Sequence, residues 1–261
     1  MNFIDRMRPA AGLRVLITAG ASGIGAVIAK AFLEVDAKVM ICDIDTPALT
    51  AFTAAHPGLL SETTDVSDAG AVETLIDSVR TQLGGLDVLV NNAGIAGPTG
   101  RIDTLEVDDI RRTIEIDLMS QFLVTRRSAG MLRESRGVIL NMSSVAGRLG
   151  ISLRTPYAAA KWGIVGLTES LARELGPDGV RVNAILPGIV RGDRIEKVLT
   201  ARAKAEGVTY DEMEKLYLQN TSLRRMVEPE DIASMALFLC SPAGANLSGQ
   251  AISVCANVET L

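Results

Sequence analysis

Short apolar runs alternate along the chain with longer stretches that have helical spacing. Each run is apolar at successive positions, which is typical of parallel strands that are covered on both faces. We expect strands over 13–18, 37–42, 86–90, 137–142, 181–186 and 250–254, with a weaker candidate over 59–66. Helical spacing recurs over 24–35, 69–83, 105–132 and 157–175. This alternation predicts repeated βαβ units.

The order of these elements predicts an α/β fold, a Rossmann-type doubly wound parallel sheet of about seven strands with helices on both faces. No internal repeat or Pro/Gly-rich linker divides the sequence, so we predict a single domain over 1–261. Residues 192–223 have helical character, many charges and no strand, and we interpret them as a possible substrate lid. In such sheets, ligands bind outside the carboxyl ends of the strands.

The composition excludes several other classes of protein. Hydrophobic residues make up 48% of the chain, yet no apolar run approaches the roughly 18 positions that a membrane span requires. The net charge of -5 and the lack of a Lys/Arg-rich run argue against a nucleic-acid partner. Residues 1–14 lack the apolar core of a secretory signal. We therefore expect a cytoplasmic protein without a membrane partner.

The cysteine content points the same way. The chain has 3 cysteines, Cys42, Cys240 and Cys255, and they share no CxxC spacing. An odd number of cysteines without that spacing makes a disulfide framework or a zinc site improbable. We expect free thiols, which suit a reducing compartment, and no metal site.

A glycine-rich turn follows the first predicted strand and opens a helix. It reads Thr18-Ala-Gly-Ala-Ser-Gly-Ile-Gly25. Glycines let the backbone approach a pyrophosphate, and the start of the helix offers free N–H groups and a partial positive charge. The alternative is a plain strand-to-helix turn, but the flanking strand and helix are the context in which this motif is trusted. We predict that a dinucleotide contacts Gly20, Ser22, Gly23, Ile24 and Gly25.

An acidic residue ends the second predicted strand. Asp43 stands 18 residues after Gly25, where a carboxylate can accept hydrogen bonds from the adenosine ribose hydroxyls and would repel a 2′-phosphate. Because Ser22 is not basic, no cation is evident to bind that phosphate, and the sequence favours NAD(H) over NADP(H). The alternative role for Asp43 is a helix N-cap, which Asp45 or Thr46 fits better.

Three further residues form a candidate catalytic group. Tyr157 and Lys161 are four residues apart near the start of a predicted helix, so both project from one face. A nearby ammonium stabilises the phenolate that accepts a proton. Ser144 ends a predicted strand 13 residues before Tyr157, and its hydroxyl could hold the substrate oxygen during proton exchange. Taken singly, each also suits a plain structural role: a turn serine, an anchoring aromatic or a solvated lysine.

Together with the glycine turn, this group resembles the classical short-chain dehydrogenase/reductase family over about 13–254. The resemblance implies that Ser144 is the catalytic serine, that Tyr157 is the general acid/base, and that Lys161 stabilises its phenolate and binds the nicotinamide ribose. Hydride would pass between nicotinamide C4 and the carbon that carries the substrate oxygen. The resemblance also implies a homotetramer or homodimer, and cofactor contacts at Ile44, Asp65, Val66, Asn91, Ala93, Gly94, Pro187, Gly188 and Ile189.

Two of the departures from the family pattern concern the glycine-rich turn and the catalytic group. Ala19 stands where the family usually has a glycine, and its methyl group is harmless only if φ is negative there. Asp117 occupies the position of the fourth catalytic residue, usually an Asn that organises a water chain to the lysine. A carboxylate facing Lys161 would stabilise the ammonium and oppose formation of the Tyr157 phenolate.

The sequence therefore predicts an NAD-dependent oxidoreductase that acts on the CH–OH group of a secondary alcohol, or on the matching ketone. We expect a small polar substrate such as a hydroxy acid, a sugar or polyol, or a 3-oxoacyl compound. An anionic group on it could contact the arginines near the predicted site, unless these are ordinary surface charges: Arg148, Arg154, Arg191 and Arg194. The alternative function is a catalytically impaired nucleotide-binding regulator with the same fold.

Overall fold

A computed structural model describes residues 2–258, with the backbone alone at positions 201, 202 and 205. In this part of the chain the strands form one seven-stranded parallel sheet of order β3-β2-β1-β4-β5-β6-β7. This order confirms the predicted Rossmann-type, doubly wound fold. The strands are β1 (Arg14–Thr18), β2 (Lys38–Asp43), β3 (Leu60–Thr63), β4 (Val88–Asn91), β5 (Val138–Met142), β6 (Arg181–Pro187) and β7 (Ala251–Val254).

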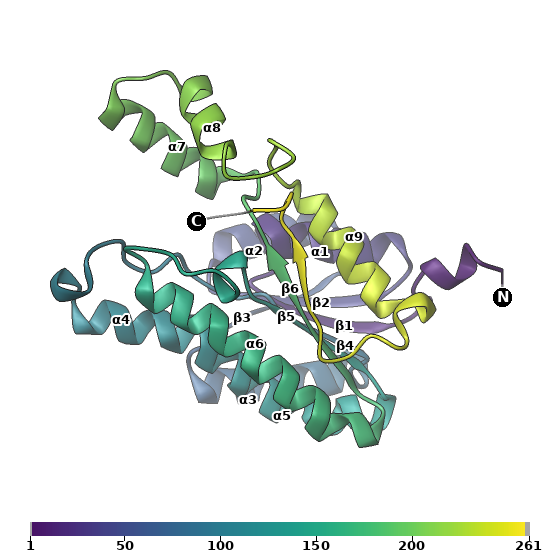
Figure 1. The fold of residues 1–261 in the computed structure, drawn as a ribbon. Helices are drawn as coiled ribbons and strands as arrows, with labels where there is room; N and C mark the ends of the chain where they lie inside the picture. Colours follow the sequence, from purple (N-terminus) through teal and green to yellow (C-terminus); the bar gives the residue numbers. More distant parts are fainter. Residues whose placement is uncertain (1, 259–261) are drawn as a thin grey trace.

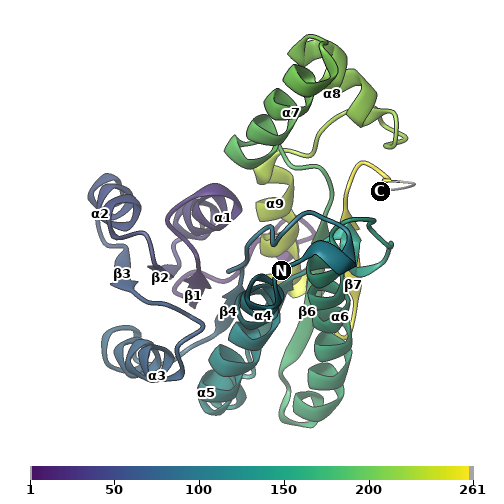
Figure 2. The ribbon, with the colours of Figure 1, turned by 90° about the vertical axis from the view of Figure 1, so that its left-hand side faces the viewer.

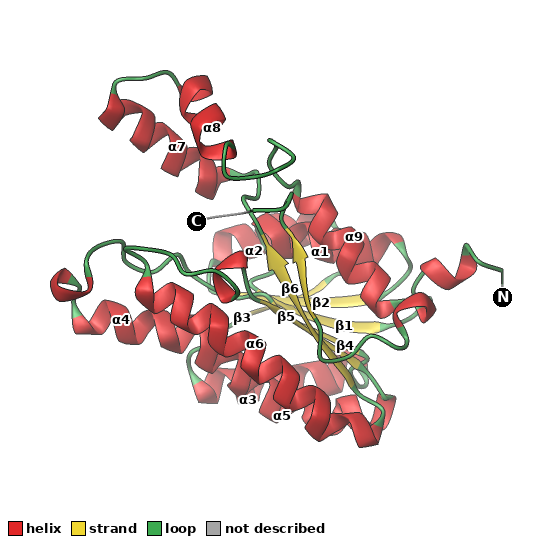
Figure 3. Cartoon of the chain, in the orientation of Figure 1, coloured by secondary structure: helices red, strands yellow, loops and turns green. Residues whose placement is uncertain are grey.

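Helices cover both faces of the sheet (Figures 1 and 2). One layer contains α1 (Gly23–Glu34), α2 (Thr46–Ala55) and α9 (Pro229–Cys240). The opposite layer contains α3 (Ala69–Ser78), α4 (Val107–Ile114), α5 (Ser120–Ser135) and α6 (Thr155–Leu175). A hairpin of α7 (Asp193–Glu206) and α8 (Tyr210–Leu218) stands apart from both layers at the top of Figure 3.

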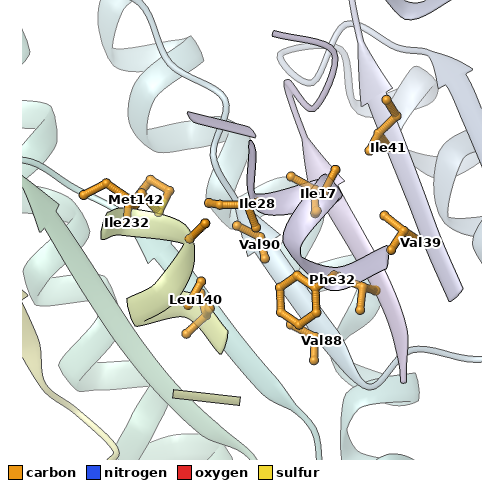
Figure 4. Close-up of a cluster of buried hydrophobic side chains, with 14 of the residues drawn as sticks. Ile17, Ile28, Phe32, Val39, Ile41, Val88, Val90, Leu140, Met142 and Ile232 are labelled. Atoms are coloured by element: carbon orange, nitrogen blue, oxygen red, sulfur yellow. The ribbon is translucent and has the colours of Figure 1, made fainter. Parts of the chain in front are cut away.

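Two apolar cores hold the sheet between its layers. Successive side chains of a strand point to opposite faces, so Val15 and Ile17 pack in one core and Leu16 in the other. Figure 4 shows the first core, in which Phe32 of α1 and Ile232 of α9 lie against the strands. Burial on both faces explains why the central strands read as largely apolar, whereas the edge strand β3 is polar and only partly buried.

Two of the predicted helices contain π-helical turns. The stretch predicted as one helix over 105–132 consists of α4, a π-helical turn at Glu115–Met119, and α5. A second π-helical turn, Val79–Leu83, follows α3. Such a turn adds one residue between hydrogen-bonded partners, so it changes which side chains face inward without ending the helix. The first of these turns carries Asp117.

The described part of the chain contains no helix with both the length and the apolar character that crossing a bilayer demands.

The three cysteines are free thiols. Burial raises the pKa of Cys42 and the pKa of Cys240 to about 12, so both thiols stay protonated at neutral pH.

Candidate active site

The glycine-rich turn joins β1 to α1 at the sheet edge where the strand order reverses. A β-carbon at Gly20 would lie 2.7 Å from the Ile41 side chain, and one at Gly25 would collide with the Ala19 carbonyl oxygen. Gly23 has a φ of +52°. The side chain of Ser22, the N-cap of α1, makes no capping hydrogen bond, and the first turn has no acidic residue. The N–H groups there fit a pyrophosphate.

Two polar residues fasten this turn to β4. The Asn92 amide donates to the carbonyl oxygens of Thr18 and Ala19, at 3.0 Å each. In return, Thr18 Oγ1 accepts from the backbone N–H groups of Asn92 at 2.9 Å and Ala93 at 3.0 Å. Sequence reasoning assigned no role to Thr18 or Asn92, although both lie inside the motifs it identified. They position the segment after β4 beside the predicted phosphate site.

The Asn91 side chain points elsewhere. Its amide donates to Thr125 Oγ1 of α5 at 3.0 Å and to Asn141 Oδ1 of the neighbouring strand β5 at 2.9 Å, and both partners are buried. A cofactor contact from Asn91 would therefore come from its backbone.

Asp43 lies at the carboxyl end of β2, 9% exposed. Its Oδ2 accepts from the Ala21 N–H and its Oδ1 from the Asp45 N–H, each at 3.1 Å. Among the described residues, Asp43 forms no ion pair with a lysine or arginine. Asp45, not Asp43, caps α2 by accepting from the Ala48 N–H. The carboxylate of Asp43 is thus held against the glycine turn by two backbone N–H groups.

The next positions line the same sheet edge. Ile44 follows Asp43 and is 65% exposed, so its side chain is accessible at this edge. Asp65, after β3, accepts from the N–H and the hydroxyl of Ser67, whereas Val66 is buried.

Ser144, Tyr157 and Lys161 come together from β5 and α6. Ser144 follows β5 and its Oγ accepts from the Ala146 N–H at 3.2 Å. Lys161 lies one turn after Tyr157, with its Nζ 5.5 Å from the centre of the Tyr157 ring. Neighbouring Ser143 is buried and donates to the Lys161 carbonyl at 2.7 Å, which ties β5 to α6. Ser143 thus has a structural partner, and Ser144 is the serine left beside α6.

Asp117 lies fully buried in its π-helical turn and faces Lys161. Its Oδ2 is 4.0 Å from Lys161 Nζ and has no hydrogen-bond partner among the described residues. Its Oδ1 accepts from the Ile95 N–H at 2.6 Å. Burial raises the pKa of Asp117, against the charge of Lys161 and the Ile95 hydrogen bond.

Gly94 fits between these two charged groups. A β-carbon there would lie 3.2 Å from Asp117 Oδ1 and 3.3 Å from Lys161 Nζ. Any larger residue at 94 would have to push one of the two groups aside.

The segment after β6 links the sheet edge to the α7–α8 hairpin. The Gly188 N–H donates to the Val254 carbonyl at 3.0 Å, and a β-carbon at Gly188 would lie 2.7 Å from Cys255 Cα. Pro187 is buried at the end of β6, and Ile189 packs with the small core of the hairpin. The backbone of this segment is therefore fixed at the end of β6, where the resemblance implies a contact with the coenzyme.

Two of the four predicted substrate arginines are bonded to partners outside the catalytic group. Arg191 pairs with Glu228 at 3.0 Å and with Glu214 at 3.7 Å. Arg148 donates to the Ala251 carbonyl of β7 at 2.7 Å.

The other two arginines lie beside the catalytic residues. The guanidinium carbon of Arg154 is 4.2 Å from the centre of the Tyr157 ring, and its Nη2 donates to the Ala96 carbonyl at 2.6 Å. Nη2 of Arg194 lies 3.3 Å from the Gly94 carbonyl oxygen. In the structure, Arg154 and Arg194 therefore lie near the catalytic residues, whereas Arg148 and Arg191 are bonded elsewhere.

A parallel sheet with a glycine turn at its switch point, together with a Ser after β5 and a Tyr and Lys on helix α6, defines a dinucleotide-dependent oxidoreductase. The family model described as enoyl-(acyl carrier protein) reductase matches residues 18–256. Galactitol 2-dehydrogenase of Agrobacterium fabrum is 37% identical over 229 residues, which cover 87% of this chain and 89% of that protein. The chain belongs to the classical short-chain dehydrogenase/reductase family.

Solved structures agree with this assignment. A variant of actinorhodin polyketide ketoreductase with NADPH has a TM-score of 0.89 at 30% identity, covering 96% of this chain and 98% of that chain. A 7α-hydroxysteroid dehydrogenase complexed with NADH and 7-oxo glycochenodeoxycholic acid has a TM-score of 0.88 at 32% identity, covering 98% and 97%. The protein is thus an oxidoreductase of hydroxyl and keto groups that uses a nicotinamide coenzyme.

Proposed function

We propose that this protein is an NAD(H)-dependent dehydrogenase/reductase that interconverts a secondary alcohol and its ketone in a small polar substrate. The main support is the position of Tyr157 and Lys161, one turn apart on α6, which is tied to the end of β5 through Ser143, the residue before Ser144. Relatives named as a galactitol dehydrogenase and a hydroxysteroid dehydrogenase support a reaction at a carbinol carbon.

The protein's own groups move the proton. A bound nicotinamide coenzyme supplies C4, which accepts a hydride in oxidation and gives one back in reduction. Tyr157 takes the hydroxyl proton of the alcohol in oxidation and returns it to the ketone oxygen in reduction. Ser144 holds that oxygen, and Lys161 stabilises the phenolate charge. In total, one alcohol and NAD⁺ give one ketone, NADH and one proton.

A turnover assay tests this function against the regulator. NADH absorbance is followed with a panel of secondary alcohols and ketones, in parallel with NADH binding. We expect turnover in the unmodified protein and a loss of roughly a hundredfold or more in kcat for Tyr157→Phe, with NADH binding retained. Binding of NADH by the unmodified protein without any turnover would favour the regulator.

The preference for NAD(H) is supported by Asp43, whose carboxylate would repel a 2′-phosphate. We expect kcat/KM to be at least about tenfold higher with NADH than with NADPH, which corresponds to about 1.4 kcal/mol. Asp43→Ser should narrow this ratio, because it removes the repulsion. Asp45→Ser, which removes the neighbouring carboxylate but leaves a side chain that can still cap α2, is the matched control and should leave the ratio unchanged. Equal efficiency with both coenzymes in the unmodified protein would overturn the assignment.

The α7–α8 hairpin, within 192–223, is our candidate for the substrate lid. It packs around a core of its own that includes Leu199, Met213 and Met226, and it joins the sheet edge through Ile189. The cytoplasmic location and the assembly into a homotetramer or homodimer remain predictions from the sequence.

A further inference from the structure

We propose that the substrate carries a carboxylate close to the carbon that is oxidised or reduced, and that Arg154 and Arg194 bind this carboxylate. The inference rests on the proposed function and deepens it, since it names the substrate class of the same site. It starts from two guanidinium groups that have protein partners for only part of their hydrogen-bonding capacity.

Arg154 lies directly over the acid/base. Its guanidinium carbon is 4.2 Å from the centre of the Tyr157 ring, and one of its five N–H donors is used by the Ala96 carbonyl. No carboxylate in the described part of the chain pairs with it. An anion bound to the remaining donors would therefore lie beside the phenol that exchanges the proton.

Arg194 reaches the same segment from the side opposite to Asp117. It donates to the Gly94 carbonyl, while Asp117 accepts from the N–H of the same peptide bond, that of Ile95. The C=O and N–H of a trans peptide point in opposite directions, and no peptide bond in the described residues is cis. Arg194 thus lies on the exposed side of this peptide, and Arg154 bonds to the carbonyl two residues further on.

The local charge balance favours an anion. Lys161, Arg194 and Arg154 are the cations whose charges act on Asp117, the single carboxylate buried among them in the described structure. Asp193 and Glu196 begin α7, but neither forms an ion pair with Arg154 or Arg194. These three cations therefore outnumber the one carboxylate buried among them, which leaves an excess of positive charge around it.

The start of α6 adds to this excess. Arg154 is its N-cap residue and makes no capping bond, and the first turn of the helix has no acidic residue. A cation at a helix N-terminus is electrostatically unfavourable, because the helix dipole is positive there. A bound anion would relieve both charges, and a guanidinium fork matches the two oxygens of a carboxylate.

The short distance between Arg154 and Tyr157 limits the substrate. The carboxylate must lie within a few bonds of the reacting carbon, as it does in 2- and 3-hydroxy acids and their oxo acids. The reaction is then one hydroxy acid and NAD⁺ giving one oxo acid, NADH and one proton. Hydride leaves the carbinol carbon, and the hydroxyl proton leaves through Tyr157.

Matched substrate pairs test the proposal, because each pair differs only in a carboxylate replaced by CH₂OH. The pairs are threonate with threitol, galactonate with galactitol, and 3-hydroxybutanoate with butane-1,3-diol. We expect at least one acid to exceed its neutral partner about tenfold or more in kcat/KM. Arg154→Gln and Arg194→Gln should each lower kcat/KM for that acid about tenfold, mainly through KM, and change the neutral partner by less than about threefold.

Two further variants complete the design. Arg154→Lys keeps the charge without the fork and should recover part of the lost affinity for the acid. Arg111→Gln, on the exposed face of α4 and paired with Asp108, is the matched control and should leave both members of each pair unchanged. Thermal melting and NADH binding show whether each variant is folded.

Several results would overturn the proposal. Neutral partners turned over as well as the acids would refute the substrate class while leaving the proposed function intact. Preference for glycerol 3-phosphate over every acid would assign the pair to phosphate. If Arg194→Gln raises the KM for NADH, and raises it equally whether the second substrate is the acid or its neutral partner, then Arg194 binds the coenzyme and not the substrate. No turnover of any alcohol or ketone would instead refute the proposed function itself.

Discussion

Ala19 has a left-handed backbone conformation within the phosphate-binding turn. Its φ is +50°, whereas the sequence alone left open whether φ there is negative. The left-handed region costs an L-residue about 1–2 kcal/mol, a cost that glycine avoids. We predict that Ala19→Gly raises the free energy of unfolding by about 1 kcal/mol, measured by urea denaturation at one fixed protein concentration.

A control for this substitution lies two residues away. Ala21 is buried in the same turn and is absent from the residues with positive φ. Ala21→Gly should therefore lower the free energy of unfolding, by about 0.5–1 kcal/mol. If both variants change stability in the same direction, strain at Ala19 is not the cause.

Asp117 is the residue whose chemistry departs most from the family pattern. An ionised carboxylate 4.0 Å from Lys161 stabilises the ammonium and so weakens its support for the Tyr157 phenolate. We predict that Asp117→Asn retains or raises kcat near neutral pH. The acidic limb of the pH profile for alcohol oxidation should also move to lower pH. The pH dependence of kcat is the measurement, and a drop of a hundredfold or more would show that the carboxylate itself is needed.

Among single residues, those whose role follows from their chemical type and their spacing could be predicted from the sequence. Tyr157 and Lys161 are four positions apart on one helix, so their proximity needs no tertiary information. Thr18 and Asn92 act through hydrogen bonds across two strands, and no local pattern encodes such a contact. The division of the arginines likewise depends on where loops fold, because Arg194 reaches the Gly94 carbonyl from a position 100 residues further along the chain.

At the scale of elements, the apolar runs predicted the strands well because burial on both faces leaves few polar positions. The π-helical turn at Glu115–Met119 could not be predicted, because one extra residue in a turn leaves the apolar pattern almost unchanged. That turn positions Asp117 against Lys161. The sequence of this stretch is typical of a regular helix, yet its backbone departs from α-helical geometry at the turn that carries Asp117.

The amino ends of β1 and β4 are held together by one charged cluster. Arg14 donates to both carboxylate oxygens of Asp87 at 2.8 Å, and also to the Gly84 carbonyl. Burial alone would raise the pKa of Asp87, but the hydrogen bonds and charge of Arg14 outweigh it and leave this pKa lowered. We predict that Asp87→Asn lowers the free energy of unfolding by about 2 kcal/mol at pH 7, measured by urea denaturation.

The lowered pKa of Asp87 also predicts how its contribution to the free energy of unfolding changes with pH. A carboxylate with a lowered pKa stabilises the folded state above its unfolded pKa of about 3.9, and this contribution is lost as pH falls through the folded pKa. The difference between Asp87→Asn and the unmodified protein should therefore shrink below about pH 4. Glu34→Gln, in an exposed pair with Lys30 on α1, is the control and should change stability by less than about 0.5 kcal/mol. A difference that stays constant down to pH 2 would contradict the charged interaction.

At the scale of the whole molecule, the chain winds outward from β1 in both directions. The first three strands run from β1 to β3 on one side, and the chain then returns to place β4 on the other side of β1. The connections that follow β1 and β4 therefore run to opposite sides of the sheet. In folds of this type, the ligand binds in the crevice between them. This topology explains how Asp43, Ser144 and Tyr157, far apart in sequence, lie along the same edge of the sheet.

The surface of the single chain also bears on its assembly. Large apolar side chains are exposed on neighbouring elements of one layer: Met119 and Phe122 at 44% each and Trp162 at 51%. Exposed apolar side chains that gather in one region mark interaction surfaces, and these lie on α6 and around the start of α5. We predict that they are buried between copies of the chain in the expected homotetramer or homodimer.

Trp162 makes this prediction measurable, because it is the sole tryptophan in the sequence. Light scattering should show an oligomer at micromolar concentration, and dilution should shift the tryptophan emission to the red as Trp162 becomes exposed to water. Trp162→Glu should weaken the assembly, because a charge buried in an interface is strongly unfavourable. Ile44→Glu introduces the same charge at an exposed apolar position beside the coenzyme site and should leave the assembly unchanged. A monomer at micromolar concentration, or an emission unaffected by dilution to the monomer, would show that this surface does not form the interface.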